Sequence, residues 1–304
     1  MVEPVQQFDV ISMGRIGVDL HPPQSGVRPA RGESSGKPLG GSAANVAVTA
    51  ARLGRTTALI SRTGADPVGT YLHRTLTDFG VDTRWVTPAG SSPTHPKTPD
   101  LDIHTDELDY FAIRAARLFW ITGTGLSGEP SRSATLAALK CRDRASVTVF
   151  DLDRPLRNGT ARPDTDAARP YYAEALRHAT VAVGTLDECE LVTGARGPRA
   201  CADALLAAGV ELAVVNQGPE GVLAVHRDGT TAEAAPVPVE VVGGPGADHA
   251  FGGSLCHGLL SGWELERTIR YATAAGAPVD ARHASAPAIP AQAEIDGLLN
   301  GITP

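Results

Sequence analysis

The sequence is poor in cysteine and has no long hydrophobic run, and both absences narrow what the protein can be. Its 304 residues include only four cysteines, and no two of them form a CxxC pair. Neither a disulfide framework nor a zinc site is therefore predicted. The N-terminal segment lacks the basic and apolar regions of a secretion signal, and no run is long enough to span a bilayer. We expect a cytoplasmic protein.

Clusters of positive charge are missing as well. The chain has 27 lysines and arginines against 34 aspartates and glutamates, which gives a net charge of −7. Nucleic acids and anionic membranes attract basic surfaces, so the sequence argues against both as partners. With 42% hydrophobic residues, the chain can build the core of one large α/β domain or of two small ones.

What the sequence does contain is a regular alternation of short β-branched runs and helical patterns. Apolar strands between helices are typical of a mostly parallel sheet covered on both faces. Ligands of such sheets bind beyond the carboxyl ends of the strands, so the loops that follow the strands are of most interest. We expect strands at residues 9–13, 57–61, 117–121, 147–150, 180–183, 212–215 and 222–225, and helices at about 43–53, 67–79, 132–140, 171–178 and 200–208.

The most informative stretch is Val241–Gly253, where a glycine-rich loop leads into an apolar helix start. Backbone N–H groups at such a junction, with the helix dipole behind them, form a site for an anion. Asp248 and His249 lie inside this stretch. Because a carboxylate repels a phosphate, the sequence predicts an anion site whose charge has been altered.

Four stretches together resemble the PfkB (ribokinase-like) family of carbohydrate kinases: Gly14–Asp19, Gly40–Gly54, Arg62–Gly69 and Gly243–Gly253. Within that family the sequence is most similar to the 5-dehydro-2-deoxygluconokinases of inositol catabolism. The resemblance implies a single ribokinase-like domain over residues 1–304, an α/β fold with a doubly wound, mostly parallel sheet, helices on both faces and a β lid. It also implies ATP and magnesium as cofactors, a small polyhydroxylated substrate under the lid, and a homodimer.

The lid is expected to be reduced. The resemblance places its elements at about residues 15–40 and 82–104, and only residues 88–98 stand where relatives insert further strands. Such a short connection, rich in proline and serine, cannot form a two-stranded cover of the usual strand length. His95 lies in this connection, and we expect it to be an exposed loop histidine.

On the sugar side the family pattern is kept. The resemblance implies that Asp19 binds sugar hydroxyls and that Asn45 donates and accepts hydrogen bonds. Gly40 and Gly41 would let the backbone approach the ligand closely. Each polar residue has an alternative: Asp19 as a solvated strand-end carboxylate, and Asn45 as a helix cap. Arg15 either contacts a substrate carboxylate or faces water.

On the nucleotide side the pattern is altered. Where family members have Gly-Ala-Gly-Asp, this sequence has Gly246, Ala247, Asp248 and His249. The resemblance puts His249 in the position of the general base, a role that an imidazole can fill near neutral pH. Asp248 replaces a glycine whose N–H helps to hold the transferring phosphoryl group, and a fixed carboxylate opposes that charge. A rebuilt loop would instead make Asp248 the base.

Other residues on the nucleotide side also depart from the family pattern. Asn216 stands where close relatives have lysine, Thr273 replaces an asparagine near the adenine, and Pro278 should break or shorten the C-terminal helix. Asp151 and Asp153 follow a strand, and either face the site or are solvated. The resemblance assigns nucleotide or anion binding to Gly244, Gly246, Ala247, Gly218, Gly221, Thr185 and Glu188.

Three hypotheses follow from these residues. The first is a kinase of a sugar, sugar acid or cyclitol that uses His249 as its base. The second is a different enzyme on the same scaffold, in which Asp248 and His249 act as acid and base on a polyhydroxylated substrate without ATP. The third is a pseudokinase that binds a ligand or partner without catalysis, because a fold alone does not determine function.

Overall fold

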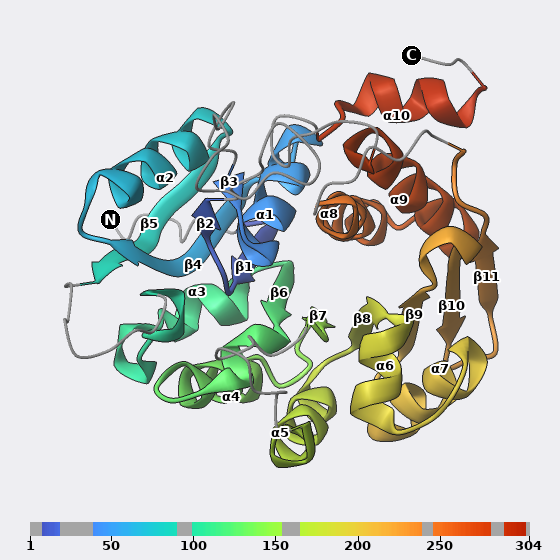
Figure 1. Cartoon of the computed structure of the whole chain (residues 1–304), viewed down its shortest axis with the longest axis horizontal. Helices are drawn as coiled ribbons and strands as arrows, with labels where there is room; N and C mark the ends of the chain where they lie inside the picture. The colour runs from blue at the N-terminus through green and yellow to red at the C-terminus, as the bar shows by residue number, and fades with distance from the viewer. Residues whose placement is uncertain are drawn as a thin grey trace, which may run out of the picture.

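The structure, a computed structural model, describes residues 8–18, 39–89, 99–153, 165–238, 246–280 and 289–301. Its centre is a nine-stranded sheet in the order β11-β10-β9-β8-β7-β6-β1-β4-β5 (Figure 1). Neighbouring strands from β5 to β9 run parallel, whereas β10 and β11 are antiparallel. The strands are β1 (Val10–Met13), β4 (Thr57–Gly64), β5 (Val81–Ala89), β6 (Leu118–Thr122), β7 (Val147–Asp151), β8 (Val181–Thr185), β9 (Leu212–Asn216), β10 (Val222–His226) and β11 (Thr231–Ala234).

The predicted α/β fold with a mostly parallel sheet is confirmed. Each expected strand is present, with ends that differ from the expected ones by at most three residues. The sequence did not predict β5 and β11, which are the two edge strands of the sheet. β5 pairs with β4 along its length, so residues 81–89 belong to the large sheet. The assignment of residues 82–104 to a lid stays a prediction, and β2 (Gly17–Val18) and β3 (Leu39–Gly40) form a separate two-stranded sheet.

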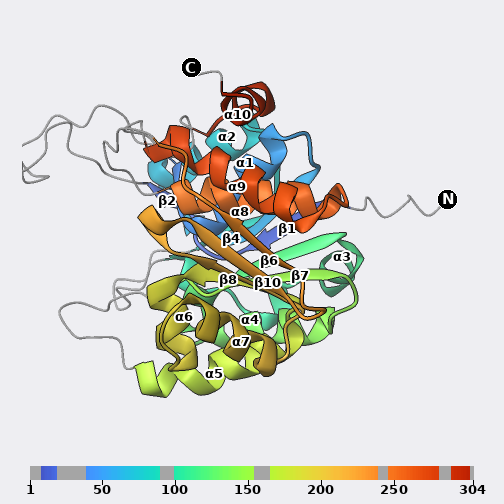
Figure 2. The same cartoon turned by 90° about the vertical axis from the view of Figure 1, so that its right-hand side faces the viewer.

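Helices cover both faces of the sheet, with α1, α2, α8 and α9 on one face and α3 to α7 on the other (Figures 1 and 2). The alternation of side chains along β6 explains this arrangement. Phe119 and Ile121 belong to the core that includes α4, α5 and α7, whereas Leu118 and Trp120 pack in the core beneath α8 and α9. The helices are α1 (Ser42–Arg52), α2 (Pro67–Asp78), α3 (Tyr110–Ala115), α4 (Ser131–Arg142), α5 (Thr165–His178), α6 (Leu186–Thr193), α7 (Pro198–Ala208), α8 (Ala247–Leu260), α9 (Leu265–Asp280) and α10 (Gln292–Leu299).

The C-terminal helices differ from the expectation at one point. α9 continues past Pro278 to Asp280, so a break at the proline is wrong, whereas the alternative that the proline shortens the helix stays a prediction. Pro278 lies near the end of α9, where it removes one N–H donor without interrupting the preceding turns. Within the described ranges, none of the helices combines the length and the apolar character needed to cross a bilayer.

Two glycines of α8 determine how closely this helix lies on the sheet. A Cβ at Gly252 would come within 2.7 Å of the Trp120 ring, and one at Gly253 would come within 2.3 Å of the Thr49 Cβ. Only glycine therefore allows α8 to pack against both β6 and α1 at this distance. This packing places the first turn of α8, with Asp248 and His249, above the carboxyl ends of the strands.

The Arg62–Gly69 stretch has a structural explanation. The Asp66 carboxylate caps α2 by accepting a hydrogen bond from the Gly69 N–H at 2.8 Å. A Cβ at Gly69 would lie 1.9 Å from the Gly64 carbonyl oxygen, which excludes any other residue. The Arg62 guanidinium forms ion pairs with Asp102 and Glu107. This stretch therefore fixes the turn after β4 and the segment at residues 99–107.

Candidate functional site

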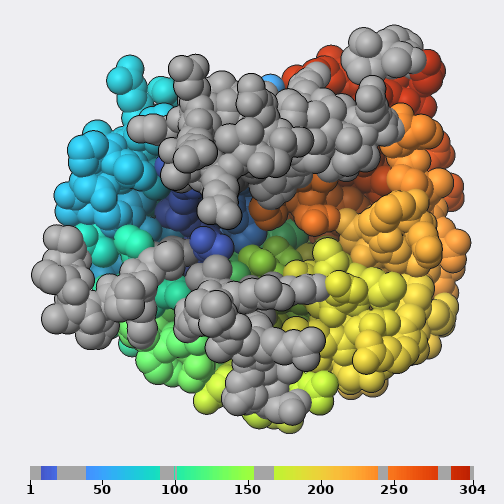
Figure 3. Space-filling model, viewed as in Figure 1, coloured from blue at the N-terminus to red at the C-terminus, as the bar shows by residue number. Residues whose placement is uncertain are grey.

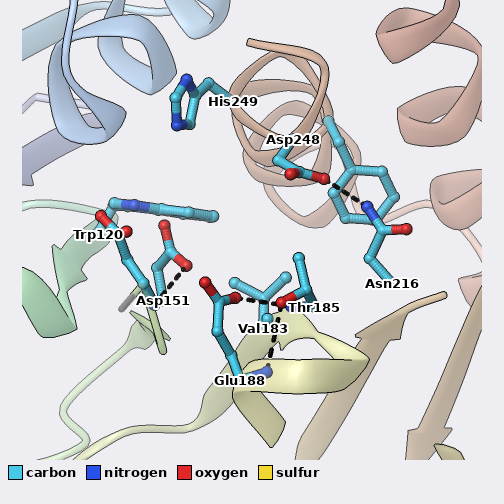
Figure 4. A pocket seen from close by; sticks show the side chains of 11 residues that line it. Trp120, Asp151, Val183, Thr185, Glu188, Asn216, Asp248 and His249 are labelled. Atoms are coloured by element: carbon cyan, nitrogen blue, oxygen red, sulfur yellow. Dashed lines mark hydrogen bonds between the residues drawn. The ribbon is translucent and has the colours of Figure 1, made fainter. Parts of the chain in front are cut away.

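A cavity lies at the carboxyl ends of β6 to β9, and the first turn of α8 covers it from the opposite side (Figure 4). The space-filling view shows the surface hollowed here, between α8 in orange and the region of α6 in yellow (Figure 3). The position agrees with the rule that ligands of parallel sheets bind beyond the strand ends. The residues that line it are Trp120, Asp151, Asp153, Val183, Gly184, Thr185, Glu188, Asn216, Asp248, His249 and Phe251.

Four carboxyl groups share this cavity, which we call the acidic cavity. Burial raises the pKa of Asp151 well above its ordinary value, and the neighbouring Asp153 and Glu188 carboxylates raise it further. Burial also raises the pKa of Asp153, against the lowering effect of its hydrogen bond with Ser42. Burial likewise raises the pKa of Glu188. Negative charge is therefore costly in this cavity, since burial disfavours the charged forms of Asp151, Asp153 and Glu188 and neighbouring carboxylates repel one another.

Thr185 and Glu188 are joined in a capping box at the start of α6. The Thr185 N–H donates to Glu188 Oε2 at 2.8 Å, and the Glu188 N–H donates to Thr185 Oγ1 at 3.4 Å. Both side chains nevertheless line the acidic cavity. Their predicted role in nucleotide binding stays a prediction, and the capping box provides a structural reason for this pair in addition.

The Asp248 carboxylate is hydrogen-bonded to Asn216, the residue that stands where a lysine was expected. The Asn216 side-chain amide, at the end of β9, donates to Asp248 Oδ1 at 2.5 Å. The Asn216 Oδ1 in turn accepts a hydrogen bond from the Gly218 N–H at 2.9 Å. A neutral amide thus occupies the place next to the carboxylate, and no lysine or arginine is among the described residues that line this cavity.

His249 follows Asp248 and reaches the same cavity (Figure 4). Its Nδ1 is buried and has no hydrogen-bond partner among the described residues. Because Asp248 and His249 both line the cavity, the structure brings together the two groups between which the sequence left the choice of base. Neither assignment is excluded by their positions.

Asp153 connects the acidic cavity to the substrate side. The Ser42 hydroxyl donates to Asp153 Oδ2 at 2.6 Å, across 111 residues of sequence. Ser42 opens α1, and the N-cap of this helix is Gly41 rather than Asn45. The alternative role of Asn45 as a cap is therefore wrong. Its Nδ2 instead donates to the Gly41 carbonyl at 3.2 Å, and its Oδ1 is buried without a described partner.

The Gly40–Gly41 turn lies against Arg15. Gly41 has a φ of 93°, and a Cβ on it would lie 2.5 Å from the Arg15 carbonyl oxygen. Both facts require glycine here for the sake of the fold, independently of any ligand. The Arg15 side chain is half-buried and its charge lowers the pKa of Asp153, so it faces the site rather than bulk water alone.

A second cavity, of about 280 Å³, adjoins the first and lies between the β9–β10 turn, α8 and α9. Gly218, Gly221, Gly246 and Ala247, which the sequence assigned to the nucleotide, all line it. The Thr273 hydroxyl also lies in this wall, but it donates to the Ile269 carbonyl of its own helix at 2.8 Å. Its lining is completed by Asn216, Val222, Pro236, Val237, Asp248, Phe251, Thr273, Gly276 and Ala277.

The second cavity is less polar than the acidic cavity. Its walls are mostly apolar side chains and glycines, which leave room for a flat ring. A phosphate at the start of α8 would meet Asp248 instead of a cation. In the described part of the chain, no three His, Cys, Asp or Glu side chains are arranged to hold a metal ion. Asp19, Gly244 and His95 lie outside the described residues.

Sequence reasoning left several residues of the site unassigned. Trp120 and Phe251 line the acidic cavity, although both look like ordinary core residues of a strand and a helix. Asp151 and Asp153 were left between the site and solvent, and both line the cavity. Their position directly after β7 was the available signal, because parallel strands end at one edge of the sheet.

Comparison with known proteins identifies the family of this chain. The profile of the pfkB family carbohydrate kinases matches residues 7–292. The 5-dehydro-2-deoxygluconokinase of Shouchella clausii is 29% identical over 316 residues, covering 97% of this chain and 96% of that protein. The enzyme of the same name from Clostridium perfringens is 26% identical over 309 residues, covering 94% of this chain and 90% of that protein.

Solved structures of sugar kinases share the fold. A fructokinase double mutant from Vibrio cholerae, bound to fructose, ADP and potassium, superposes with a TM-score of 0.82 at 22% identity and covers 96% of this chain and 99% of its own. The aminoimidazole riboside kinase of Salmonella enterica, in complex with aminoimidazole riboside and an ATP analogue, has a TM-score of 0.77 at 25% identity and covers 95% and 99%. The chain therefore belongs to the pfkB family of carbohydrate kinases.

Proposed function

We propose that this protein binds a sugar, sugar acid or cyclitol and phosphorylates it slowly, with His249 as the base. The observation that carries this proposal is the pair of adjoining cavities, which share Asn216, Asp248 and Phe251. A kinase needs an acceptor site and a nucleotide site that meet where the phosphoryl group is transferred. The shared wall at the start of α8 provides such a meeting point.

The family resemblance suggests the roles of the chain's own residues. A neutral His249 imidazole would take the proton from the acceptor hydroxyl. Arg15, Asp19, Gly40, Gly41 and Asn45 would hold the acceptor. Bound ATP would supply the phosphoryl group, and residues of the second cavity would hold its nucleoside. Because Asp248 opposes the charge of the transferring group, we expect a lower rate than a glycine at this position would give.

The names of the relatives suggest the first acceptor to test. 5-Dehydro-2-deoxygluconate is a sugar acid, and the enzymes named for it match almost the whole chain. The Arg15 charge lowers the pKa of Asp153, and a guanidinium is suited to bind a substrate carboxylate. Fructose and myo-inositol serve as a neutral sugar and a neutral cyclitol for comparison.

The test incubates the protein with Mg-ATP and each acceptor and measures the phosphorylated product by mass spectrometry. We expect a product that requires both compounds, and a loss of about 10²–10⁴-fold in rate for His249→Ala. His226→Ala is the matched control, because His226 lies at the end of β10 that pairs with the start of β9, away from the site. Absence of product, together with no thermal stabilisation by Mg-ATP, would reject the proposal.

The contact between Asn216 and Asp248 favours a second candidate, an enzyme that uses Asp248 and His249 as acid and base without ATP. In that case Asp248→Asn would abolish turnover of a sugar-like substrate that is converted in the absence of nucleotide. Substrates that bind but stay chemically unchanged would instead indicate a pseudokinase. Product analysis with and without ATP separates the three outcomes.

A further inference from the structure

We propose that the acidic cavity takes a polyhydroxylated ligand with a protonated amine, that is, an amino sugar or an aminocyclitol. The proposal rests on the function proposed above and names the class of acceptor that this site would prefer. It depends on the charge of the cavity walls and on an indole N–H that has no partner.

The charge of the cavity walls is the first argument. Asp151, Asp153, Glu188 and Asp248 line the cavity, and its described lining residues include no lysine or arginine. An ammonium group placed among these carboxylates would offset their mutual repulsion and could donate three hydrogen bonds to them. A neutral sugar offers no such compensation. Burial raises the pKa values of Asp151, Asp153 and Glu188, so a cation beside them would favour their charged forms.

The side chain of Trp120 is the second and independent argument. The residue is 1% exposed and lines the cavity, and its indole N–H has no acceptor within the described ranges. A buried donor without a partner is costly, so a ligand oxygen is the natural acceptor. The aromatic ring also suits a cation, because the face of an indole attracts ammonium groups. Figure 4 shows the ring together with the Asp151 and Glu188 carboxyl groups around the same space.

Nearby side chains other than carboxylates exert a lowering effect on the pKa of Asp153. Arg15 and His249 both lower the pKa of Asp153, and Ser42 donates to it. Asp151 and Glu188 face backbone groups of Asp153 and Thr185 and one another. The ammonium group is therefore expected near Asp151, Glu188 and Asp248, and the hydroxyl groups near Trp120 and Asp153.

A divalent metal ion is the other cation that carboxylates attract. Across the described residues, however, no three metal-binding side chains have the arrangement that such an ion needs. An ammonium group makes no demand for a fixed coordination geometry, since it requires only acceptors at hydrogen-bond distance.

The test measures binding by isothermal titration calorimetry with two matched pairs: glucosamine against glucose, and scyllo-inosamine against scyllo-inositol. We expect at least one amine to bind tenfold or more tightly than its neutral partner at pH 7. We also expect proton release on binding, seen as a dependence of the heat on the ionisation enthalpy of the buffer, because the ammonium charge ionises carboxyl groups with raised pKa values.

Two variants test whether the carboxylates of the acidic cavity cause the preference for the amine. Glu188→Gln keeps a side chain that can complete the capping box and removes one charge, so it should reduce the preference for the amine several-fold. Asp203→Asn removes an equal charge from the exposed surface of α7 and should leave the preference unchanged. Equal or tighter binding of the neutral partners in both pairs would overturn the inference, and phosphorylation of a neutral sugar would then leave the proposed function standing. Binding of no member of either pair, without phosphorylation of any acceptor, would overturn both.

Discussion

Asp248 carries the charge that most directly opposes a nucleotide, and its removal gives a sharp prediction. We expect Asp248→Asn to tighten the binding of Mg-ATP. The substitution preserves shape, and the new amide oxygen can still accept the hydrogen bond that Asn216 donates at 2.5 Å. It therefore removes the charge at the start of α8 while the local hydrogen bonding is kept. The N–H groups of the first helical turn would then face the phosphates without a competing carboxylate.

The size of the effect follows from Coulomb's law. Two unit charges about 5 Å apart interact by about 3 kcal/mol at an effective dielectric constant of about 20. Because Asp248 is exposed, solvent screening reduces this value to about 1 kcal/mol, as for other exposed charges. A change of about 1 kcal/mol corresponds to about a fivefold lower Kd. The effect should shrink at high salt, where the Debye length falls to about 3 Å.

The assay is calorimetric titration of Mg-ATP into the wild type, Asp248→Asn and Asp203→Asn at low and high salt. Asp203→Asn makes the same change in net charge on an exposed helix, so it reports the long-range part of the effect alone. An unchanged Kd for Asp248→Asn, or an equal gain in Asp203→Asn, would refute the reasoning. Phosphates would then lie elsewhere than at the start of α8.

Three further predictions concern stability. A carboxyl whose pKa is raised by folding destabilises the protein increasingly as pH rises through the unfolded-state pKa. Asp151→Asn should therefore raise the free energy of unfolding at pH 7 and change it little at pH 3. Urea titrations at both pH values check this. Thr185→Ala removes an N-cap and should cost about 1 kcal/mol in the same assay, whereas Thr185→Ser should cost less. Gly253→Ala places a Cβ 2.3 Å from the Thr49 Cβ, and this overlap of about 1–3 kcal/mol should outweigh the gain in helix propensity, with a lower melting temperature as the readout.

The fold could be predicted where continuous apolar runs indicate buried strands. The strands buried on both faces, such as β6 and β9, have continuous apolar sequences and are confirmed within a few residues. The edge strands β5 and β11 escaped prediction because polar residues interrupt the apolar ones in their sequences. α9 continued through Pro278 because position within a helix, rather than the presence of proline alone, decides whether the helix breaks.

The site was predictable where a motif identifies its position in the chain, as at Asp248 and His249. It was not predictable where residues far apart in sequence meet. The hydrogen bond between Ser42 and Asp153 spans 111 residues, and no local pattern indicates it. Trp120 lies in an apolar strand, so only the structure shows that its N–H has no partner. A sequence pattern indicates which face of a strand is buried, but it does not indicate which residues from other parts of the chain pack against that face.

The negative charge of Asp248 affects the binding of both the nucleotide and the acceptor. The Asp248 carboxylate at the start of α8 weakens phosphate binding if the acceptor is neutral, because no lysine or arginine lies in the described walls of the acidic cavity. An acceptor with an ammonium group would change this balance, since its positive charge would lie between Asp248 and the other carboxylates. Binding of the amine and of Mg-ATP should then be mutually favourable, and linkage requires each to tighten the other by the same factor. Altered residues on the nucleotide side are thus compatible with phosphotransfer when the acceptor itself supplies the missing cation.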